Sequence, residues 1–315
     1  MNSEKNSFST PVIDVHVHPK RKNVLILDEI LNLMDKFCIR ISVLLGRDTD
    51  PNNIDKPEIR RYIIERLTNS PLYDRFGIDD ALHLEELLYL MKERLARVIT
   101  NSEIAGYVRR YPQRFIGMGS IDLSKSSEYV DNKIKEIIKL GLAGAKFWPQ
   151  LQFFNPATSE NFRLVAERFS KVHKIIMVHT GTAPGPWEIP ELSEYARPSH
   201  LELVAQEFDV PILVAHFGYY SATVPGIWFK EALELGKKHD NIYFDVSAVT
   251  YILNNEKYVK LIREYVGFDR VLFGSDYLEY LETSIKMIYN SHLLRYEEKE
   301  KILGLNALEL FNIKI

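Results

Sequence analysis

The segment VIDVHVH at residues 12–18 combines β-branched residues with two histidines, His16 and His18, that stand one residue apart. Its apolar character predicts a buried β-strand. Because side chains alternate along a strand, both imidazoles are expected on the same face. A buried polar side chain needs a hydrogen-bond partner or a ligand. The segment therefore predicts either two hydrogen-bonded structural histidines or two histidines that share one ligand.

Seven further segments resemble this one in length and apolar character. They read ISVLLG (41–46), RFIGMGSI (114–121), LAGAKFW (142–148), KIIMVHT (174–180), PILVAHF (211–217), NIYFDVS (241–247) and RVLFGSD (270–276). Most are near-continuous apolar runs, which is typical of parallel strands covered on both faces. Segments with helical periodicity separate them. This alternation, without a break in composition, predicts an α/β fold, namely a single (β/α)8 TIM barrel over residues 1–315.

One interval interrupts the alternation. At about 47–106, roughly sixty residues separate the second predicted strand from the helix that leads to the third. The interval opens with the turn-rich RDTDPNNIDKP and continues with two segments of helical character. Loops that follow barrel strands leave from the C-terminal face, where the active site forms. We therefore expect a helical insertion after the second strand, as a cap or as a dimer surface.

Composition narrows the class of protein. The formal net charge of −3 gives no indication of binding to nucleic acid or to an anionic membrane. The single cysteine, Cys38, excludes an intramolecular disulfide and nearly excludes thiolate ligands. The first eleven residues lack the apolar core of a secretory signal, and no apolar run reaches the roughly 18 residues of a membrane helix. We expect a cytoplasmic protein that binds a small molecule.

Residue types that bind metals recur at the ends of the predicted strands. The first strand ends with His16 and His18, the fifth with His179, the sixth with His216 and the eighth with Asp276. Barrel enzymes place their chemistry at these strand ends. Several imidazoles with one carboxylate suit a divalent ion, zinc by default, with manganese, iron or cobalt as alternatives. Such an ion activates water, which is the equipment for hydrolysis.

Each of these residues also has an ordinary structural interpretation. A single histidine at a strand end is often a hydrogen-bonded core residue, and Asp276 could cap the helix that follows it. Asp14 lies deeper on the face of His16 and is expected to accept hydrogen bonds in the core. Asp245 is either a support for a ligand or a buried polar residue. Recurrence at four strand ends favours the metal site for the set as a whole.

The ordered motifs IDVHVHP, GAKFWPQ, VHTGT, VAHFG, NIYFDVSA and LFGSDY resemble those of the amidohydrolase-related metal-dependent hydrolases. Within them, the branch that includes aminocarboxymuconate-semialdehyde decarboxylase is the most similar. The resemblance covers most of the chain and implies one divalent metal held by His16, His18, His179 and Asp276. It implies that His216 polarises the substrate or moves a proton, and that Asp276 takes a proton from water. It also suggests a homodimer.

Lys146, in the motif GAKFWP, leaves the number of metals open. In some amidohydrolases a carboxylated lysine on the fourth strand bridges two metals. In this branch a histidine commonly stands where this chain has Trp148. Lys146 is therefore a bridging ligand for a second metal, a contact for a substrate carboxylate or phosphate, or a structural lysine in an ion pair. We expect one metal.

The substrate is less well defined by the sequence. Arg47 directly follows the second strand and is either a contact for a substrate carboxylate or a surface arginine. The aromatic residues near strand ends either line a pocket or pack in the core, namely Phe147, Trp148, Trp187, Tyr219 and Tyr220. The expected substrate contacts are Arg47, Lys146, Trp148 and Tyr219.

Three functions are compatible with this pattern. The first is hydrolysis of an amide, ester or lactone of a small organic substrate by water that the metal activates. The second is nonoxidative decarboxylation of a small unsaturated or aromatic acid at the same metal. The third is a catalytically silent barrel that serves as a binding subunit, and the full set of candidate ligands argues against it.

Overall fold

The computed structural model describes residues 10–21, 24–71 and 81–314. Within them, eight parallel strands form two sheets with the orders β1-β4-β5 and β10-β9-β8-β7-β6. Their bounds are β1 (Val12–Val17), β4 (Ile39–Leu45), β5 (Phe115–Met118), β6 (Gly144–Phe147), β7 (Ile175–His179), β8 (Ile212–Ala215), β9 (Ile242–Asp245) and β10 (Val271–Leu272). Each corresponds to one of the eight predicted strands. A short antiparallel hairpin, β2 (Lys20–Arg21) and β3 (Val24–Leu25), follows β1.

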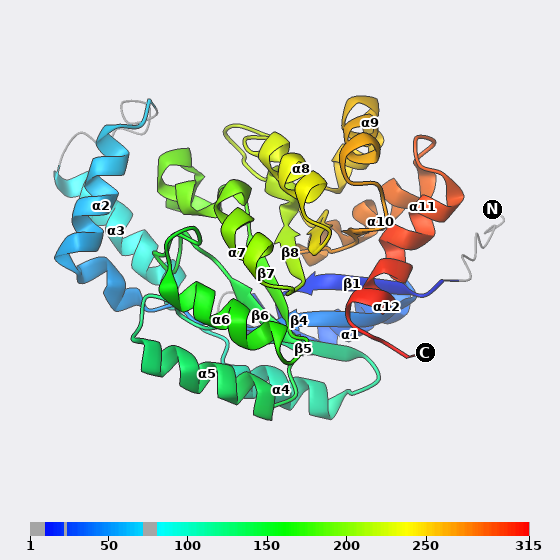
Figure 1. The fold of residues 1–315 in the computed structure, drawn as a ribbon, viewed down its shortest axis with the longest axis horizontal. Coiled ribbons are helices and arrows are strands. Elements are labelled where there is room, and N and C mark those ends of the chain that lie inside the picture. The colour runs from blue at the N-terminus through cyan, green and yellow to red at the C-terminus, as the bar shows by residue number, and fades with distance from the viewer. Residues whose placement is uncertain (1–9, 22–23, 72–80, 315) are drawn as a thin grey trace.

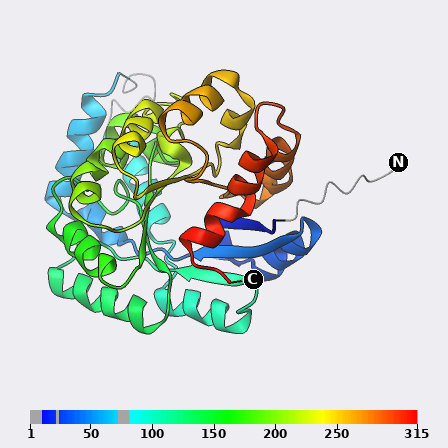
Figure 2. The ribbon, with the colours of Figure 1, turned by 45° about the vertical axis from the view of Figure 1, so that its right-hand side comes forward.

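Backbone contacts join the two sheets at both edges. On one side a parallel bridge pairs Gly119, just after β5, with Ala145 of β6. On the other side the amide of Val15 in β1 donates to the carbonyl of Phe273, just after β10, at 3.0 Å. The eight strands therefore close into the predicted (β/α)8 barrel, which Figures 1 and 2 show from two directions.

Helices surround the strands in the order expected of βα units (Figure 2). The α-helices are α1 (Leu27–Lys36), α4 (Asn101–Arg110), α5 (Ser127–Lys139), α6 (Glu160–Ser170), α7 (Glu202–Glu207), α8 (Phe229–Lys238), α9 (Glu256–Tyr265), α10 (Leu281–Asn290), α11 (Tyr296–Glu300) and α12 (Asn306–Leu310). The shorter helical segments are η3 (Gly185–Glu188), η4 (Pro190–Ala196), η5 (Pro198–Leu201), η6 (His216–Gly218), η7 (Thr250–Asn254), η8 (Leu278–Tyr280) and η9 (Lys301–Leu305). Side-chain caps begin several of them, as Ser126 does for α5 and Ser159 for α6.

Two apolar layers hold the barrel together. A large cluster lies between strands and helices, and includes Val130, Ile134 and Ile137 from the buried face of α5. A second cluster contains side chains from strands all around the barrel, namely Val15, Val43, Met118, Met177, Leu213 and Leu272. Only the interior of a closed barrel brings residues of such different strands together. The barrel interior below the polar residues at the C-terminal strand ends is therefore filled by this second apolar cluster.

The segment between β4 and β5 contains helices beyond the barrel set. These are η1 (Pro51–Asp55), α2 (Pro57–Thr68) and α3 (Ala81–Leu95), which lie together at one end of the molecule in Figure 1. An antiparallel bridge pairs Arg47 with Ile99, so both ends of this inserted segment lie side by side. Helix α4 begins at Asn101 behind a capping box of Thr100 and Glu103. The insertion thus ends near residue 100, earlier than the expected 106, and its residues 72–80 lie outside the described residues.

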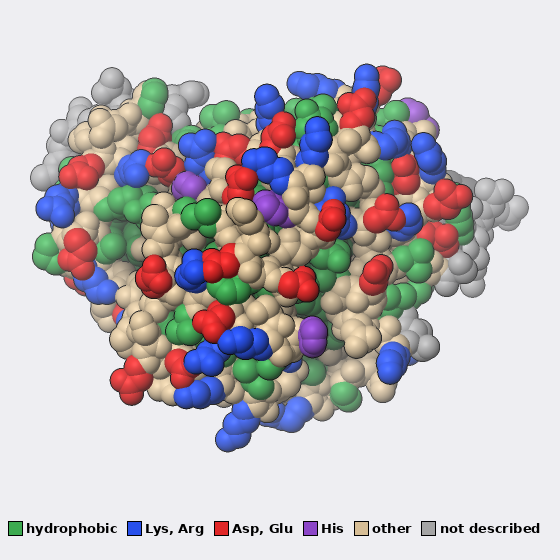
Figure 3. Space-filling model, in the orientation of Figure 1, with side chains coloured by type: hydrophobic (Ala, Val, Ile, Leu, Met, Phe, Trp, Pro, Cys, Tyr) green, Lys and Arg blue, Asp and Glu red, His purple; other side chains and the backbone are tan. Residues whose placement is uncertain are grey.

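The insertion packs on loops at the C-terminal ends of the strands. Leu67, Leu88 and Met91 from α2 and α3 share a buried cluster with Trp148 and Trp187, which follow β6 and β7. The insertion therefore covers the strand ends on that side. Acidic and basic side chains are interspersed over the face shown in Figure 3. Among the described residues, no helix has the length and apolarity that crossing a membrane requires.

Candidate metal centre and its cavity

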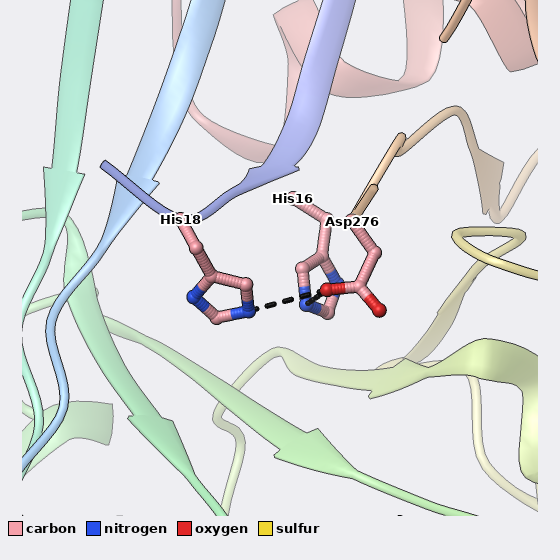
Figure 4. Close-up of side chains that lie close together, drawn as sticks. All are labelled: His16, His18 and Asp276. Carbon is pink, nitrogen blue, oxygen red and sulfur yellow. Dashed lines mark ion pairs between the residues drawn. The ribbon is translucent and has the colours of Figure 1, made fainter. Parts of the chain in front are cut away.

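Two strands bring His16, His18 and Asp276 together (Figure 4). The Nε2 atom of His18 lies 3.2 Å from Oδ1 of Asp276, and Nε2 of His16 lies 3.7 Å from the same oxygen. Their donor atoms all lie within 4.8 Å of one another. The sequence prediction that the imidazoles of the first strand meet the carboxylate of the eighth is therefore confirmed.

The backbone at Asp276 aims this carboxylate. Asp276 has a φ of 59°, a left-handed conformation that is uncommon outside glycine, and its amide donates to the carbonyl of His16 at 2.9 Å. The short helix η8 starts later, behind Tyr277, and no side chain caps it. The interpretation of Asp276 as a helix cap is therefore wrong. Burial opposes ionisation, but the hydrogen bond from His18 and the nearby imidazoles hold the pKa of Asp276 well below its usual range.

Asp245, at the end of β9, orients His16. Its Oδ2 lies 3.0 Å from Nδ1 of His16, and both side chains are buried. Because burial lowers the pKa of His16 to about 3, the ring is neutral, and because the carboxylate only accepts, the proton sits on Nδ1. The lone pair on Nε2 then faces Asp276. A carboxylate behind a histidine in this way is the usual support of a metal ligand. Asp14 accepts from the amides of His16 and Ser275, as expected of a core acceptor.

His179 and His216 show a second convergence of lone pairs. Nε2 of His179 lies 2.8 Å from the carbonyl of Thr182, and Nδ1 of His216 lies 2.9 Å from the carbonyl of Ser247. Carbonyls only accept, so those two nitrogens carry the ring protons. Burial lowers the pKa of both histidines. The remaining nitrogens, Nδ1 of His179 and Nε2 of His216, therefore face each other with lone pairs at 3.1 Å.

The donor set fits a divalent cation. The fixed protons leave unprotonated nitrogens on His16, His179 and His216 in one cluster with the carboxylate of Asp276. Lone pairs that face one another repel unless a cation lies among them. Nitrogen and carboxylate donors of this kind suit zinc and manganese alike. His179 joins the cluster through His216, whose ring centroid is 4.6 Å from that of His179 and 4.9 Å from that of His16.

The cluster opens into a cavity of about 290 Å³. Its walls include the metal-site residues and basic and aromatic side chains, namely His16, His18, Lys20, Ile26, Arg47, Arg94, Arg97, Ile99, Trp148, His179, Pro184, His216, Asp276, Tyr277, Leu278 and Glu279. A volume at the low end of the roughly 300–1,000 Å³ typical of ligand pockets fits a small molecule. His16, His18, His179, His216 and Asp276 all lie in the wall of this cavity.

A family model described as amidohydrolase matches residues 13–313. This chain belongs to the amidohydrolase family. A comparison with curated protein sequences gives no match.

Three solved structures share the barrel of this amidohydrolase. An uncharacterized TIM-barrel protein from Bordetella bronchiseptica is 16% identical, with a TM-score of 0.65 over 96% of this chain and 98% of its own. The 5-carboxyvanillate decarboxylase from Novosphingobium aromaticivorans, with bound manganese, is 15% identical, with a TM-score of 0.62 over 97% and 98%. A probable 2-pyrone-4,6-dicarboxylic acid hydrolase from Acinetobacter baumannii, with citric acid bound, is 15% identical, with a TM-score of 0.59 over 96% and 100%.

Lys146 of this amidohydrolase is fully buried beside the cluster. Its Nζ has no hydrogen-bond partner within the described part of the chain and lies 5.5 Å from the centre of the Trp148 ring. The interpretation as a structural lysine in an ion pair is therefore wrong. Burial lowers the pKa of Lys146 to about 8. Burying an amine without a hydrogen-bond partner is costly. The bridging and substrate-contact interpretations of Lys146 would each give Nζ a partner, and both stay predictions.

Arg47 lies in the cavity wall rather than on the surface. Its Nη2 donates to the carbonyl of Arg94 at 2.7 Å, and its guanidinium carbon lies 5.6 Å from the centre of the Trp148 ring. The Trp148 ring in turn lies 5.8 Å from the ring of His18. Arg47 and Trp148 therefore both line the cavity, and their contact with substrate stays a prediction. The surface interpretation of Arg47 is wrong.

The predictions that Tyr219 and Tyr220 line the pocket have different outcomes. Tyr219 does not reach the cavity, because left-handed conformations at His216, Phe217 and Gly218 turn the chain sharply after β8. Its hydroxyl donates to that of Tyr258 instead, at 3.1 Å. The ring of its neighbour, Tyr220, lies 5.8 Å from the ring of His216.

Two aromatic residues that were predicted near strand ends pack elsewhere. Trp187 is buried under the insertion, where its indole donates to the carbonyl of Gln150 at 3.1 Å, and Phe147 packs in the outer core. The sequence analysis missed several residues that the structure brings to the site, among them Arg94, Arg97, Ser247 and Tyr277. Two of them gave a signal that a strand-end argument could have used, because Ser247 closes the seventh predicted strand and Tyr277 directly follows the eighth.

Proposed function

We propose that this amidohydrolase is a metal-dependent hydrolase that acts on an amide, ester or lactone of a small organic substrate. The observation that carries the proposal is the meeting of His16 and His18 with the carboxylate of Asp276, beside the facing unprotonated nitrogens of His179 and His216. The proposed metal ligands are His16, His18, His179 and Asp276. A divalent ion held there activates water and polarises a carbonyl oxygen. One ion suffices for the proposal, and its identity is zinc or manganese.

The residues of the chain have distinct proposed roles. Asp276 is ionised at neutral pH and lies in the cavity wall, so it is the proposed acceptor for a proton of the attacking water. His216 is buried beside His179, and once its free Nε2 has taken up a proton it polarises the substrate or returns that proton to the leaving group. Asp245 keeps the proton of His16 on Nδ1 and so keeps Nε2 free. The apolar cluster in the barrel interior, which includes Val15, Met177 and Leu213, keeps bulk water from reaching the site through the barrel.

Nonoxidative decarboxylation is the second candidate, and a specific observation favours it. Arg47, Arg94 and Arg97 line the cavity, which makes it suited to an organic acid. A decarboxylase must bind an acid, whereas a hydrolase need not. The structural relatives include a decarboxylase with bound manganese as well as a probable hydrolase of a dicarboxylic acid lactone. In this candidate His216 and Asp276 handle proton transfer to the carbon that loses carbon dioxide.

One experiment separates the two candidates. The purified protein is analysed for metal, reconstituted with zinc or manganese, and assayed against matched panels of lactones and esters and of aromatic and unsaturated acids. Release of acid from the lactone or ester panel, dependent on metal, supports the hydrolase. Release of carbon dioxide from the acid panel supports the decarboxylase and refutes the hydrolase. A protein that binds no metal on reconstitution refutes both. Gel filtration in the same preparation tests the homodimer that the resemblance suggested.

A further inference from the structure

The insertion contributes two arginines that neither the sequence motifs nor the proposed metal chemistry uses. Arg94 lies in the last turn of α3, and Arg97 follows that helix, and both line the cavity together with Arg47. None of the three forms an ion pair with a carboxylate among residues 10–21, 24–71 and 81–314. Three guanidinium groups therefore share one small cavity, in which the charge of Asp276 reaches Arg94 and Glu279 also lies in the wall, but no carboxylate among the described residues pairs with them directly.

Hydrogen bonds between β4 and the end of α3 hold these three arginines close together. The amide of Arg47 donates to the carbonyl of Ile99 at 2.8 Å, and the amide of Ile99 donates back at 2.9 Å. The hydroxyl of Thr49 donates to the carbonyl of Leu95 at 2.6 Å, in a buried position. Together with the hydrogen bond from Arg47 to the carbonyl of Arg94, these contacts fix the end of α3 against the end of β4. The three charges are therefore held close together by the fold.

The electrostatics of this cluster call for an anion. The Nε atoms of Arg47 and Arg94 are buried and have no hydrogen-bond partner in the described residues. Burial, and then the charges of Arg94 and Arg97, lower the pKa of Arg47. The carboxylates in the cavity wall are those of Asp276, which the histidines engage, and Glu279. An anionic ligand in the cavity would offset the repulsion among these guanidinium groups.

We infer that Arg94 and Arg97, next to Arg47, bind a carboxylate of the substrate that is remote from the reacting bond, so that the substrates are small dicarboxylic acids or their lactones, esters or amides. The guanidinium fork matches a carboxylate in two parallel hydrogen bonds. This inference rests on the proposed function for the place of the reacting bond, at the metal end of the cavity. Trp148, which neighbours both His18 and Arg47, forms the wall between the two ends.

The test is a comparison of binding by calorimetry. Glutarate and isophthalate are titrated against butyrate and benzoate, in the reconstituted protein and after removal of metal by a chelator. The same titrations are made with Arg94→Gln and Arg97→Gln. Arg163→Gln is the matched control, because Arg163 pairs with Glu207 on the outside of the barrel and loses the same charge.

The expected result is that dicarboxylates bind at least roughly tenfold more tightly than their monocarboxylate counterparts, and that each cavity variant removes most of this preference. Arg163→Gln leaves it unchanged. Equal binding of both acid classes by the unmodified protein overturns the inference without any variant, as does an undiminished preference in Arg94→Gln and Arg97→Gln. A protein that binds no metal but prefers dicarboxylates supports the arginine site and refutes the metal-dependent function. A metal-binding protein without this preference refutes the arginine site alone.

Discussion

The two ends of the cavity are built in different ways. At the metal end, His16, His179 and His216 each have one ring nitrogen fixed by an acceptor, and the acceptors belong to barrel strands or to the turns directly after them. At the insertion end, Arg94 and Arg97 come from a segment that the barrel does not require. The first arrangement follows from the register of a closed barrel, whereas the second depends on a few local contacts. The comparison teaches that catalysis and substrate choice are separable here, and the predictions below that concern the cavity test that separation.

The largest effect is expected from Asp276→Asn. The substitution removes the carboxylate that lies near both His16 and His18, so metal affinity falls, and activity drops by about 10³-fold or more. Metal content by mass spectrometry and kcat/KM on the substrate found in the panel measure both losses. Asp269→Asn, at an exposed ion pair with Lys301, is the control. Retention of metal and activity in Asp276→Asn would contradict the proposed centre.

His216→Asn tests whether His216 is a metal ligand or acts on the substrate. We expect it to lose activity while it keeps much of its metal, because His216 is proposed to act on the substrate. Complete loss of metal in His216→Asn would make this histidine a ligand. It would also favour a site with two metals and a carboxylated Lys146.

A smaller effect is expected from Asp245→Asn. Oδ1 of Asp245 accepts from the amides of His216 and Ser247, and an asparagine can keep those contacts. It loses the acceptor for the Nδ1 proton of His16, so the fold should persist while metal affinity falls about 10- to 100-fold. Competition with a chelator measures the affinity, with Asp209→Asn at an exposed position as the control. Unchanged affinity in a folded variant would remove Asp245 from the centre.

The metal end could be predicted from the sequence because it depends on strand order. Each of His16, His179 and Asp276 ends a recognisable apolar run, and parallel strands bring their ends to one edge of the barrel. The supporting role of Asp245 stayed one of two alternatives, since its partner is chosen by ring orientation. The tautomers of His179 and His216 could not be predicted from the sequence. They depend on the carbonyls of Thr182 and Ser247, and the positions of these carbonyls are set by the conformations of turns after the strands.

The insertion end could not be predicted for a different reason. Arg47 and Ile99 are joined by a bridge between residues that are far apart in the sequence, and no periodicity reports such a contact. Arg94 lies in the last turn of a helix and Arg97 follows it, as solvent-exposed basic residues commonly do. Tyr219 and Trp187 show the converse error, since aromatic residues near strand ends pack in the core as readily as they line a pocket.

A buried carboxyl outside the cavity wall gives a pH prediction that concerns stability alone. Asp122, after β5, is buried, and its Oδ2 has no partner in the described residues. Burial, with Asp48 nearby, raises the pKa of Asp122 from 3.8 to about 6. The folded state therefore binds more protons than the unfolded state between about pH 4 and 6, so stability falls as the pH rises through that window.

Asp122→Asn should remove this part of the pH dependence, about 1–3 kcal/mol, because the amide cannot ionise. Urea unfolding at pH 5 and pH 7.5 measures the difference. The exposed Asp209→Asn should keep the slope of the unmodified protein. If Asp122→Asn kept the pH dependence of the unmodified protein, the carboxyl of Asp122 would not be the source of that dependence.

The smallest effect is expected from Thr49→Val, and it bears most directly on separability. The hydroxyl of Thr49 donates to the carbonyl of Leu95, one residue after Arg94, so its loss loosens the segment that carries Arg94 and Arg97. A lost buried hydrogen bond costs about 1 kcal/mol, which corresponds to a roughly fivefold weaker binding of glutarate. Metal affinity should not change, because no metal-site residue contacts Thr49 among the described interactions. Thr68→Val, which removes an exposed hydroxyl bonded to Ile64 within α2, is the control. If metal affinity fell in parallel with glutarate affinity, the two ends of the cavity would be one coupled unit, and the insertion would be part of the catalytic barrel rather than a separate determinant of specificity.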